Sequence, residues 1–261
     1  MALTLCVLGS GSSGNSLYLA AGRTKLLIDA GLTARQTVLR LASLGQSIED
    51  INAVCLTHEH TDHVSGLSAI CGKHGIPVYA NRGTVEGCLA SRQAYDGRWN
   101  VFTTGSGFAV GDIDLHPFPV LHDAYEPVGF TVSSGKARMG VVTDLGSATE
   151  AVHQGLSRSS LLVVEANHDE GLLADSDRPY ALKQRIAGRN GHLSNVHAGE
   201  LLRSVIGPGI RAVFLAHLSR HCNRPELALG TVKRALLTGG FANVSVELTH
   251  ADKPSRVVVV E

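Results

Sequence analysis

Short apolar runs recur along the whole chain, and most have the length and alternation of β-strands. In the first half, strands are predicted at residues 3–8, 16–19, 25–28, 53–56, 78–80 and 113–120. In the second half, they are predicted at residues 128–132, 139–142, 161–164, 212–215, 244–248 and 257–260. The pattern therefore predicts a protein rich in short strands.

Longer stretches with helical periodicity lie between these strands. They cover residues 33–44, 63–74, 84–90, 179–186, 195–205 and 225–237. Some strands are linked directly by turns and others follow helices, which indicates a sandwich of sheets with helices outside. The chain contains no Pro- or Ser-rich linker and no internal repeat, so residues 1–261 are predicted to form a single domain.

Composition limits the classes of partner. The 23 basic and 23 acidic residues of this 261-residue chain cancel, so no overall field attracts nucleic acid or an anionic membrane. Residues 178–234 are locally basic, with ten Lys or Arg against only Glu200 and Glu226. Basic helix faces are usually solvated surface, so this region favours a nucleic-acid partner only if it borders the functional site.

The location of the protein is predicted from its N-terminus and its cysteines. The first residues carry no basic segment, and no apolar run approaches the ~18 residues of a membrane span. The five cysteines, at positions 6, 55, 71, 88 and 222, are widely spaced and form no Cys-x-x-Cys pair, so they are expected to be reduced. We expect a cytoplasmic protein with no membrane contact and no obligate protein partner.

A glycine-rich segment, Gly9-Ser10-Gly11-Ser12-Ser13-Gly14, matches the dinucleotide-binding fingerprint, and Asp29 lies further along the chain. That fingerprint requires a helix to begin at its end, so that helix N–H groups meet the pyrophosphate. Residues 15–20 and 25–29 instead form two extended runs joined by a hairpin signal. A nicotinamide cofactor is therefore disfavoured, and the glycines indicate a tight turn that either leaves N–H groups free for an anion or is purely structural.

The segment His58-Glu59-His60-Thr61-Asp62-His63 carries the clearest chemistry. It follows a predicted strand and precedes a predicted helix, and four ligand-type side chains this close indicate a metal site. Residues two apart in an extended loop point the same way, so His58 and His60 are expected to bind one ion. Asp62 and His63 are expected to bind a second ion, and Glu59 points away. Because the residue four after His58 is Asp62, the spacing excludes the His-Glu-x-x-His arrangement.

This segment resembles the metallo-β-lactamase superfamily, whose signature is H-x-H-x-D-H at a strand end, and the resemblance covers essentially the whole chain. It implies a four-layer αββα sandwich of the α/β (α+β) class, with further metal ligands at other strand ends. His122 resembles the third ligand of the first ion, with His116 as competitor. Asp144 resembles the carboxylate that bridges both ions. His217 resembles the last ligand of the second ion, with His221 as the local alternative.

Three further segments resemble the bacterial WalJ/YycJ branch of this superfamily: residues 9–16, residues 165–169 and residues 191–195. That branch is associated with DNA exonuclease activity, so the resemblance implies a nucleic-acid substrate, DNA rather than RNA. The stretch between Asp144 and His217 leaves no room for the large inserted domain of the ribonuclease J relatives, which disfavours RNA processing.

The expected reaction is hydrolysis by a hydroxide bridging two divalent metal ions, without a side-chain nucleophile. Zinc is the first choice for this ligand set, and manganese or iron are alternatives. Asp62, through the ion that it binds, and His192 are the predicted catalytic residues. His192 is expected to protonate the leaving oxygen.

The predicted substrate-binding residues are His192, Ser194, Asn195 and His168. His192 precedes Ser194 and Asn195 at the start of a predicted helix, where N–H groups and small polar side chains suit a phosphate. Ser194 also fits a simple N-cap with a surface histidine before it, and His197 fits helix surface. His168 is the next candidate for proton donor.

Two other functions fit the same residues. A thioester or lactone hydrolase of the glyoxalase II type uses the same ligands, although the basic region near His192 favours phosphodiesters. A sandwich that binds metal for redox chemistry or sensing would need a flavin or iron partner domain, which the sequence does not offer.

Overall fold

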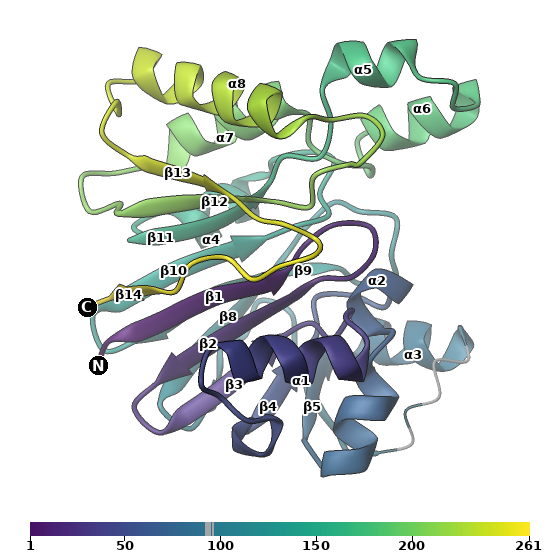
Figure 1. Ribbon diagram of the computed structural model, residues 1–261, viewed down its shortest axis with the longest axis vertical. Helices are drawn as coiled ribbons and strands as arrows, with labels where there is room; N and C mark the ends of the chain where they lie inside the picture. Colours follow the sequence, from purple (N-terminus) through teal and green to yellow (C-terminus); the bar gives the residue numbers. More distant parts are fainter. Residues whose placement is uncertain (92–94, 96) are drawn as a thin grey trace.

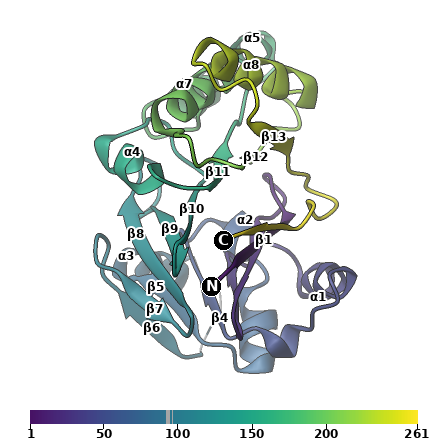
Figure 2. The same ribbon diagram turned by 90° about the vertical axis from the view of Figure 1, so that its left-hand side faces the viewer.

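The computed structural model describes residues 1–91, 95 and 97–261. Two seven-stranded sheets pack against each other, and helices cover their outer faces (Figures 1 and 2). The strand order is β14-β1-β2-β3-β4-β5-β6 in the first sheet and β13-β12-β11-β10-β9-β8-β7 in the second. The predicted αββα sandwich is confirmed.

The first sheet begins with an antiparallel meander and continues with parallel strands. Its strands are β1 (Leu3–Gly9), β2 (Ser16–Ala21), β3 (Thr24–Ile28), β4 (Ala53–Cys55), β5 (Val78–Asn81), β6 (Trp99–Phe102) and β14 (Val258–Val260). The connecting helices are α1 (Ala34–Ser43), α2 (Thr61–Val64) and α3 (Arg82–Ala90), together with a 3-10 turn (Ile48–Asp50) and a π-helical turn (Ser68–Gly72). The last strand, β14, returns to pair with β1.

The second sheet repeats this plan, with antiparallel strands up to β10 and parallel strands after it. Its strands are β7 (Phe108–Val110), β8 (Ile113–Pro119), β9 (Val128–Ser134), β10 (Ala137–Val142), β11 (Leu161–Glu165), β12 (Ala212–Ala216) and β13 (Ser245–Leu248). The helices are α4 (Glu150–Leu156), α5 (Glu170–Asp175), α6 (Tyr180–Ala187), α7 (Asn195–Val205) and α8 (Pro225–Thr238).

The apolar core has three layers, which explains why several strands read as continuous apolar runs. Alternate residues such as Leu5, Leu19, Phe130 and Phe214 meet between the two sheets. The other side of the central strands packs beneath helices, as Leu27 does under the first sheet's helices. Parallel strands with both faces covered lose the alternation of apolar and polar residues. All five cysteines are buried and unpaired, and four of them, Cys6, Cys55, Cys71 and Cys88, lie in these layers.

All twelve predicted strands are present, but the helix predicted over residues 63–74 is interrupted after Val64 and is π-helical in its middle part. The structure has the short α2, ending at Val64, and then a π-helical turn. The N–H of Gly66 donates to the carbonyl of Ala30, and a Cβ on Gly66 would lie 2.0 Å from the carbonyl oxygen of Leu32. The chain is thus held against the end of β3 instead of continuing one regular helix.

The prediction also missed strands β6 and β7 and helices α4 and α5. Both strands lie at sheet edges, where half-exposed residues such as Trp99 and Phe108 blur the pattern. The two helices are 7 and 6 residues long, too short to show a clear helical period.

The two termini lie together at the left of Figure 1, whereas α2 and α6 lie at the opposite edge of the molecule. That edge receives the carboxyl ends of the central parallel strands, where ligand sites of α/β sheets are commonly found. Among the described residues, no helix combines the length and apolarity needed to cross a bilayer.

Candidate metal centre

The loop after β4 carries the first set of candidate ligands. His58 and His60 lie two residues apart, and His122 approaches them from the end of β8. One ring nitrogen from each lies within 4.8 Å of the others. We call these three residues the first ligand group. His58 and His122 are buried.

Four more residues form the second ligand group: Asp62, His63, Asp144 and His217. Their ligand atoms also lie within 4.8 Å of one another. Nε2 of His63 is 3.1 Å from Oδ2 of Asp144, and Nε2 of His217 is 3.2 Å from Oδ2 of Asp62. Oδ1 of Asp144 is also 4.0 Å from Nε2 of His122. Asp144 therefore lies between the two groups, where a bridging carboxylate is expected.

These residues fit divalent metal ions. Nε2 of His58 is buried and has no hydrogen-bond partner among the described residues, although it faces the rest of the first ligand group. Burial lowers the pKa of His58 well below its usual value, so its ring nitrogen is available as a neutral ligand. Burial alone would lower the pKa values of His63 and His217 too, but Asp144 and the neighbouring carboxylates raise both well above the usual value. This excess of negative charge is what bound cations would balance.

Asp29 fixes the orientation of His63. Its carboxylate is buried at the end of β3, where Oδ2 accepts from Nδ1 of His63 at 2.8 Å and Oδ1 accepts from the N–H of Thr57 at 2.8 Å. The hydroxyl of Thr57 also donates to Asp29 and lies 3.0 Å from Nδ1 of His58. Because Nδ1 of His63 carries the proton, its Nε2 is left for a metal ion.

Glu165, on the second sheet, fixes the orientation of His217 and His192 in the same way. Oε1 accepts from Nδ1 of His217 at 2.9 Å and from Nδ1 of His192 at 2.8 Å. Oε2 accepts from the N–H groups of Leu145 and Leu193 at 3.2 and 3.0 Å. Burial would raise the pKa of Glu165, but His192 and His217 outweigh it and lower the pKa to about 2. In the sequence, Glu165 stands out only as part of the segment 165–169, and Asp29 only through its position after the glycine-rich segment.

The glycine-rich segment contacts the candidate ligands and continues into β2 instead of a helix. Oδ1 of Asn15 accepts from the N–H of Gly11 at 2.8 Å, and its Nδ2 donates to Oδ2 of Asp62 at 3.2 Å. The hydroxyl of Ser10 accepts from the N–H of His217 at 2.8 Å. Of the two options that the sequence left open, these contacts favour the structural turn.

Close packing of the backbone against the glycine-rich segment explains why residue 31 is a glycine. The N–H of Asn15 donates to the carbonyl of Asp62 at 2.8 Å, and the N–H of Gly31 donates to the carbonyl of Asn15 at 2.9 Å. A Cβ on Gly31 would lie only 1.7 Å from the carbonyl oxygen of Asp62. Only glycine lets three chain segments meet here.

Three residues around the second ligand group adopt left-handed backbone conformations: Asp29 with φ of 62°, Asp144 with φ of 57° and His217 with φ of 54°. Each lies one or two residues after a strand with a parallel neighbour, and a non-glycine residue in this conformation costs on the order of 1–3 kcal/mol. The surrounding hydrogen bonds hold these residues in place, which turns their side chains toward one point.

His192 lies at the edge of the centre. Its side chain is 21% exposed, and its ring centroid lies 5.1 Å from that of His122 and 5.3 Å from that of His217. Glu165 raises the pKa of His192 against the opposing effect of burial. His192 is thus the predicted substrate residue that combines exposure with contact to both ligand groups.

The other predicted substrate residues are enclosed within the protein. Ser194 caps α7 and donates to Glu170 at 2.8 Å, as the N-cap interpretation predicts. Asn195 and His168 are also buried, and Asn195 pairs with Asn223. Their contact with substrate stays a prediction, and the geometry favours a role in holding the loop of His192.

The remaining candidates lie apart from the ligand groups. Within the described residues, His116 and His221 belong to neither group. Glu59 is buried instead of lying at the surface, and its Oε1 accepts from the N–H of Tyr125 at 2.9 Å. His197 is exposed on α7, with Nδ1 3.1 Å from the hydroxyl of Ser194.

The basic region does not form one patch. Arg185 and Arg189 line a pocket next to the ligand groups, as described below. Arg220 donates to the hydroxyl of Ser13 in the glycine-rich segment. Arg211, however, precedes β12 and so lies at the end of this strand opposite to His217. Only part of the region borders the candidate centre.

Comparison with known proteins gives matches over nearly the full chain. The family described as a β-lactamase superfamily domain matches residues 24–218, a range that includes both ligand groups. An exodeoxyribonuclease YycJ of Bacillus anthracis is 34% identical over 247 residues, covering 92% of each chain. An exodeoxyribonuclease WalJ of Streptococcus pneumoniae is 34% identical over 233 residues, covering 88% of this chain and 87% of the relative.

A solved structure shows the same fold. The metallo-β-lactamase fold protein YhfI of Bacillus subtilis superposes with a TM-score of 0.72 and covers 99% of both chains, at 18% sequence identity.

Proposed function

This chain belongs to the β-lactamase superfamily, and from that premise we propose that it is an exonuclease that hydrolyses the phosphodiester bonds of DNA. It is a metal-dependent hydrolase, as its family and its clustered histidines and aspartates indicate. The observation that carries the finer proposal is the match to two exodeoxyribonucleases over nearly their whole lengths. The partly exposed His192 and the adjoining arginines support a phosphate ester over a carbonyl substrate.

We propose zinc as the metal, with manganese or iron as alternatives, because mixed imidazole and carboxylate ligands accept all three. One ion would be held by the first ligand group and the other by the second, with Asp144 shared between them. When bound, such a pair of ions supplies Lewis acidity toward the phosphate and lowers the pKa of a water molecule held between them.

The chain's own residues supply orientation and a proton. Asp29 and Glu165 keep the proton on Nδ1 of His63 and His217, so that Nε2 of each faces the centre. Nδ1 of His192 donates to Glu165, which leaves its Nε2 to bind the scissile phosphate or to protonate the leaving oxygen. We further propose that residues 1–261 act as one domain and that the protein works in the cytoplasm.

The test uses the purified protein with added zinc or manganese and four substrates: end-labelled single-stranded DNA, the same sequence as RNA, circular single-stranded DNA and S-lactoylglutathione. An exonuclease shortens the linear DNA stepwise and leaves the circle intact. The Asp62→Ala variant, purified in parallel, controls for contaminating nucleases. Turnover of S-lactoylglutathione without any cleavage of DNA would establish the thioester hydrolase instead.

A further inference from the structure

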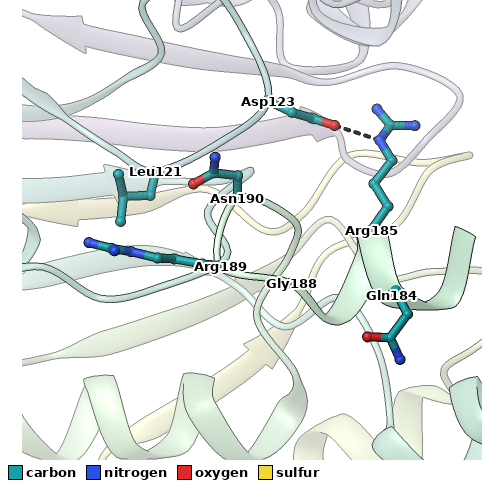
Figure 3. A pocket seen from close by; sticks show the side chains of 7 residues that line it. All are labelled: Leu121, Asp123, Gln184, Arg185, Gly188, Arg189 and Asn190. Carbon is teal, nitrogen blue, oxygen red and sulfur yellow. Dashed lines mark hydrogen bonds and ion pairs between the residues drawn. The ribbon is translucent and has the colours of Figure 1, made fainter. Parts of the chain in front are cut away.

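A pocket of about 530 Å³ lies beside the metal centre (Figure 3). It is lined by Leu121, Asp123, Gln184, Arg185, Gly188, Arg189 and Asn190. Two of these residues flank His122 in the sequence, and Asn190 lies two residues before His192. The pocket therefore adjoins a proposed metal ligand and the proposed proton donor.

Hydrogen bonds of the backbone hold the segment that carries Arg185 and Arg189 against the candidate metal centre. The carbonyl of Gly191 accepts from Nδ1 of His122 at 3.0 Å, and the N–H of His192 donates to the carbonyl of Ile186 at 2.9 Å. A Cβ on Gly146 would lie 2.4 Å from the carbonyl oxygen of Arg189, so the loop between β10 and α4 packs tightly against the segment that carries the arginines. The arginine positions are thus set relative to the ligand groups.

The two arginines differ in their partners. Arg185 reaches toward Asp123 and forms an ion pair with it, whereas Arg189 extends along the pocket toward Leu121 (Figure 3). Arg189 is exposed, and its guanidinium has no hydrogen-bond or ion-pair partner in the part of the chain that the structure describes. Asp123 neutralises one cation, and the other is left free for an anion.

A second hollow, of about 600 Å³, is lined in part by Ser10 and Leu218, next to His217. Its lining includes Arg220 and Arg224 but also Glu226 and Asp252. Acidic and basic side chains balance there, so an anion gains less from that surface than from the pocket of Arg189.

We propose that the pocket of Arg189 is a subsite for a second phosphate of the nucleic-acid strand, the one next to the phosphate being hydrolysed. The guanidinium of Arg189 binds this phosphate while the scissile phosphate lies at the metal centre. This inference rests on the proposed function and extends it, because it requires a phosphate on a particular side of the cleaved bond. A substrate with a single isolated diester leaves the subsite empty.

The test compares three thymidine dinucleotides that share one internal phosphodiester. One has hydroxyl groups at both ends, one carries a 5′-phosphate and one carries a 3′-phosphate. The wild-type protein is expected to prefer one phosphorylated form over the unphosphorylated form by on the order of tenfold in kcat/KM, as a charge-assisted hydrogen bond to phosphate allows. Which form is preferred shows which side of the strand enters the pocket.

Arg189→Gln is expected to bring this ratio close to one, and Arg189→Lys to restore part of it. Arg211→Gln makes the same charge change within the basic region but at the far end of β12, and it should keep the wild-type ratio. A wild-type ratio of one for both phosphorylated forms, or an unchanged ratio in Arg189→Gln, would overturn the proposal.

Failure of the proposed function gives a different result. If the wild-type protein does not shorten linear DNA, the exonuclease proposal fails. If it cleaves none of the dinucleotides, calorimetric binding of the same three compounds decides the subsite. Weaker binding of a phosphorylated form to Arg189→Gln than to Arg211→Gln supports the subsite, and equal binding refutes it.

Discussion

Replacing Glu165 with glutamine should remove hydrogen bonds that orient His217 in the second ligand group. The wild-type carboxylate accepts four hydrogen bonds, two from imidazole Nδ1 atoms and two from backbone N–H groups. An amide of the same shape has only one oxygen, so it can satisfy only one of these pairs. Because the site is fully buried, water cannot replace the lost acceptor.

Either orientation of the amide in Glu165→Gln is unfavourable. If its NH₂ faces the N–H groups of Leu145 and Leu193, two buried donors lose their acceptor at about 1–3 kcal/mol each. If its NH₂ faces the imidazoles, Nδ1 of His217 must become an acceptor and its proton moves to Nε2, the atom that a metal ion needs. Loss of such a supporting residue typically lowers metal affinity 10- to 100-fold.

We therefore expect Glu165→Gln to lose metal to a chelator at 10- to 100-fold lower concentration than wild type, or to unfold at a temperature lower by about 2–4 °C per kcal/mol lost. Metal content after dialysis against buffered chelator and thermal unfolding measure the two effects. Glu170→Gln is the matched control, because Glu170 lies in the same segment and accepts from Ser194 without touching a ligand. Wild-type metal affinity together with wild-type unfolding temperature in Glu165→Gln would refute this reasoning.

Three further predictions test other parts of the centre. Asp62→Ala should abolish hydrolysis and lower metal content toward one ion while leaving the far-UV circular dichroism unchanged; full metal content with normal turnover would rule out the two-ion centre. His192→Ala should keep both ions but slow the cleavage of DNA by about 10²- to 10⁴-fold, and p-nitrophenyl phosphodiesters less, because their leaving group needs no proton. Equal losses on both substrates would indicate phosphate binding, and loss of metal would contradict the assignment. Gly31→Ala should destabilise the fold by at least about 1–3 kcal/mol and weaken metal binding, because its Cβ would meet the carbonyl oxygen of Asp62 at 1.7 Å. Gly72→Ala, where a Cβ meets nothing within 4 Å, is the control in thermal unfolding, and equal stability of the two variants would count against the close packing.

Some candidate ligands could be predicted from their spacing in the sequence and others could not, because some are clustered and the others are far apart along the chain. His58, His60, Asp62 and His63 fall within six residues, so the spacing alone indicates a metal site. His122, Asp144 and His217 are separate strand-end residues, and only the family resemblance singled them out. The structure brings all seven into two groups.

Asp29 and Glu165 were missed because their partners are set by strand pairing. Asp29 meets His63 because β3 lies beside β4, and Glu165 meets His217 because β11 lies beside β12. A usable signal was present, since each is an acidic residue at the end of an apolar strand, and a buried carboxylate must have partners. Ser194 carries an ambiguity that sequence does not resolve, because the same residue type serves an N-cap and a phosphate site equally well.

Each ligand group draws members from both sheets: His58 and His60 from the first sheet meet His122 from the second, and Asp62 and His63 meet Asp144 and His217. During synthesis on the ribosome, the nascent chain therefore cannot assemble the second group until β12 has emerged and docked. The first sheet is completed later still, because β14 follows β12 along the chain and pairs with β1. We therefore expect metal loading to be a late event in the life of the polypeptide, so that a full complement of the proposed ions marks a molecule whose two sheets have already come together.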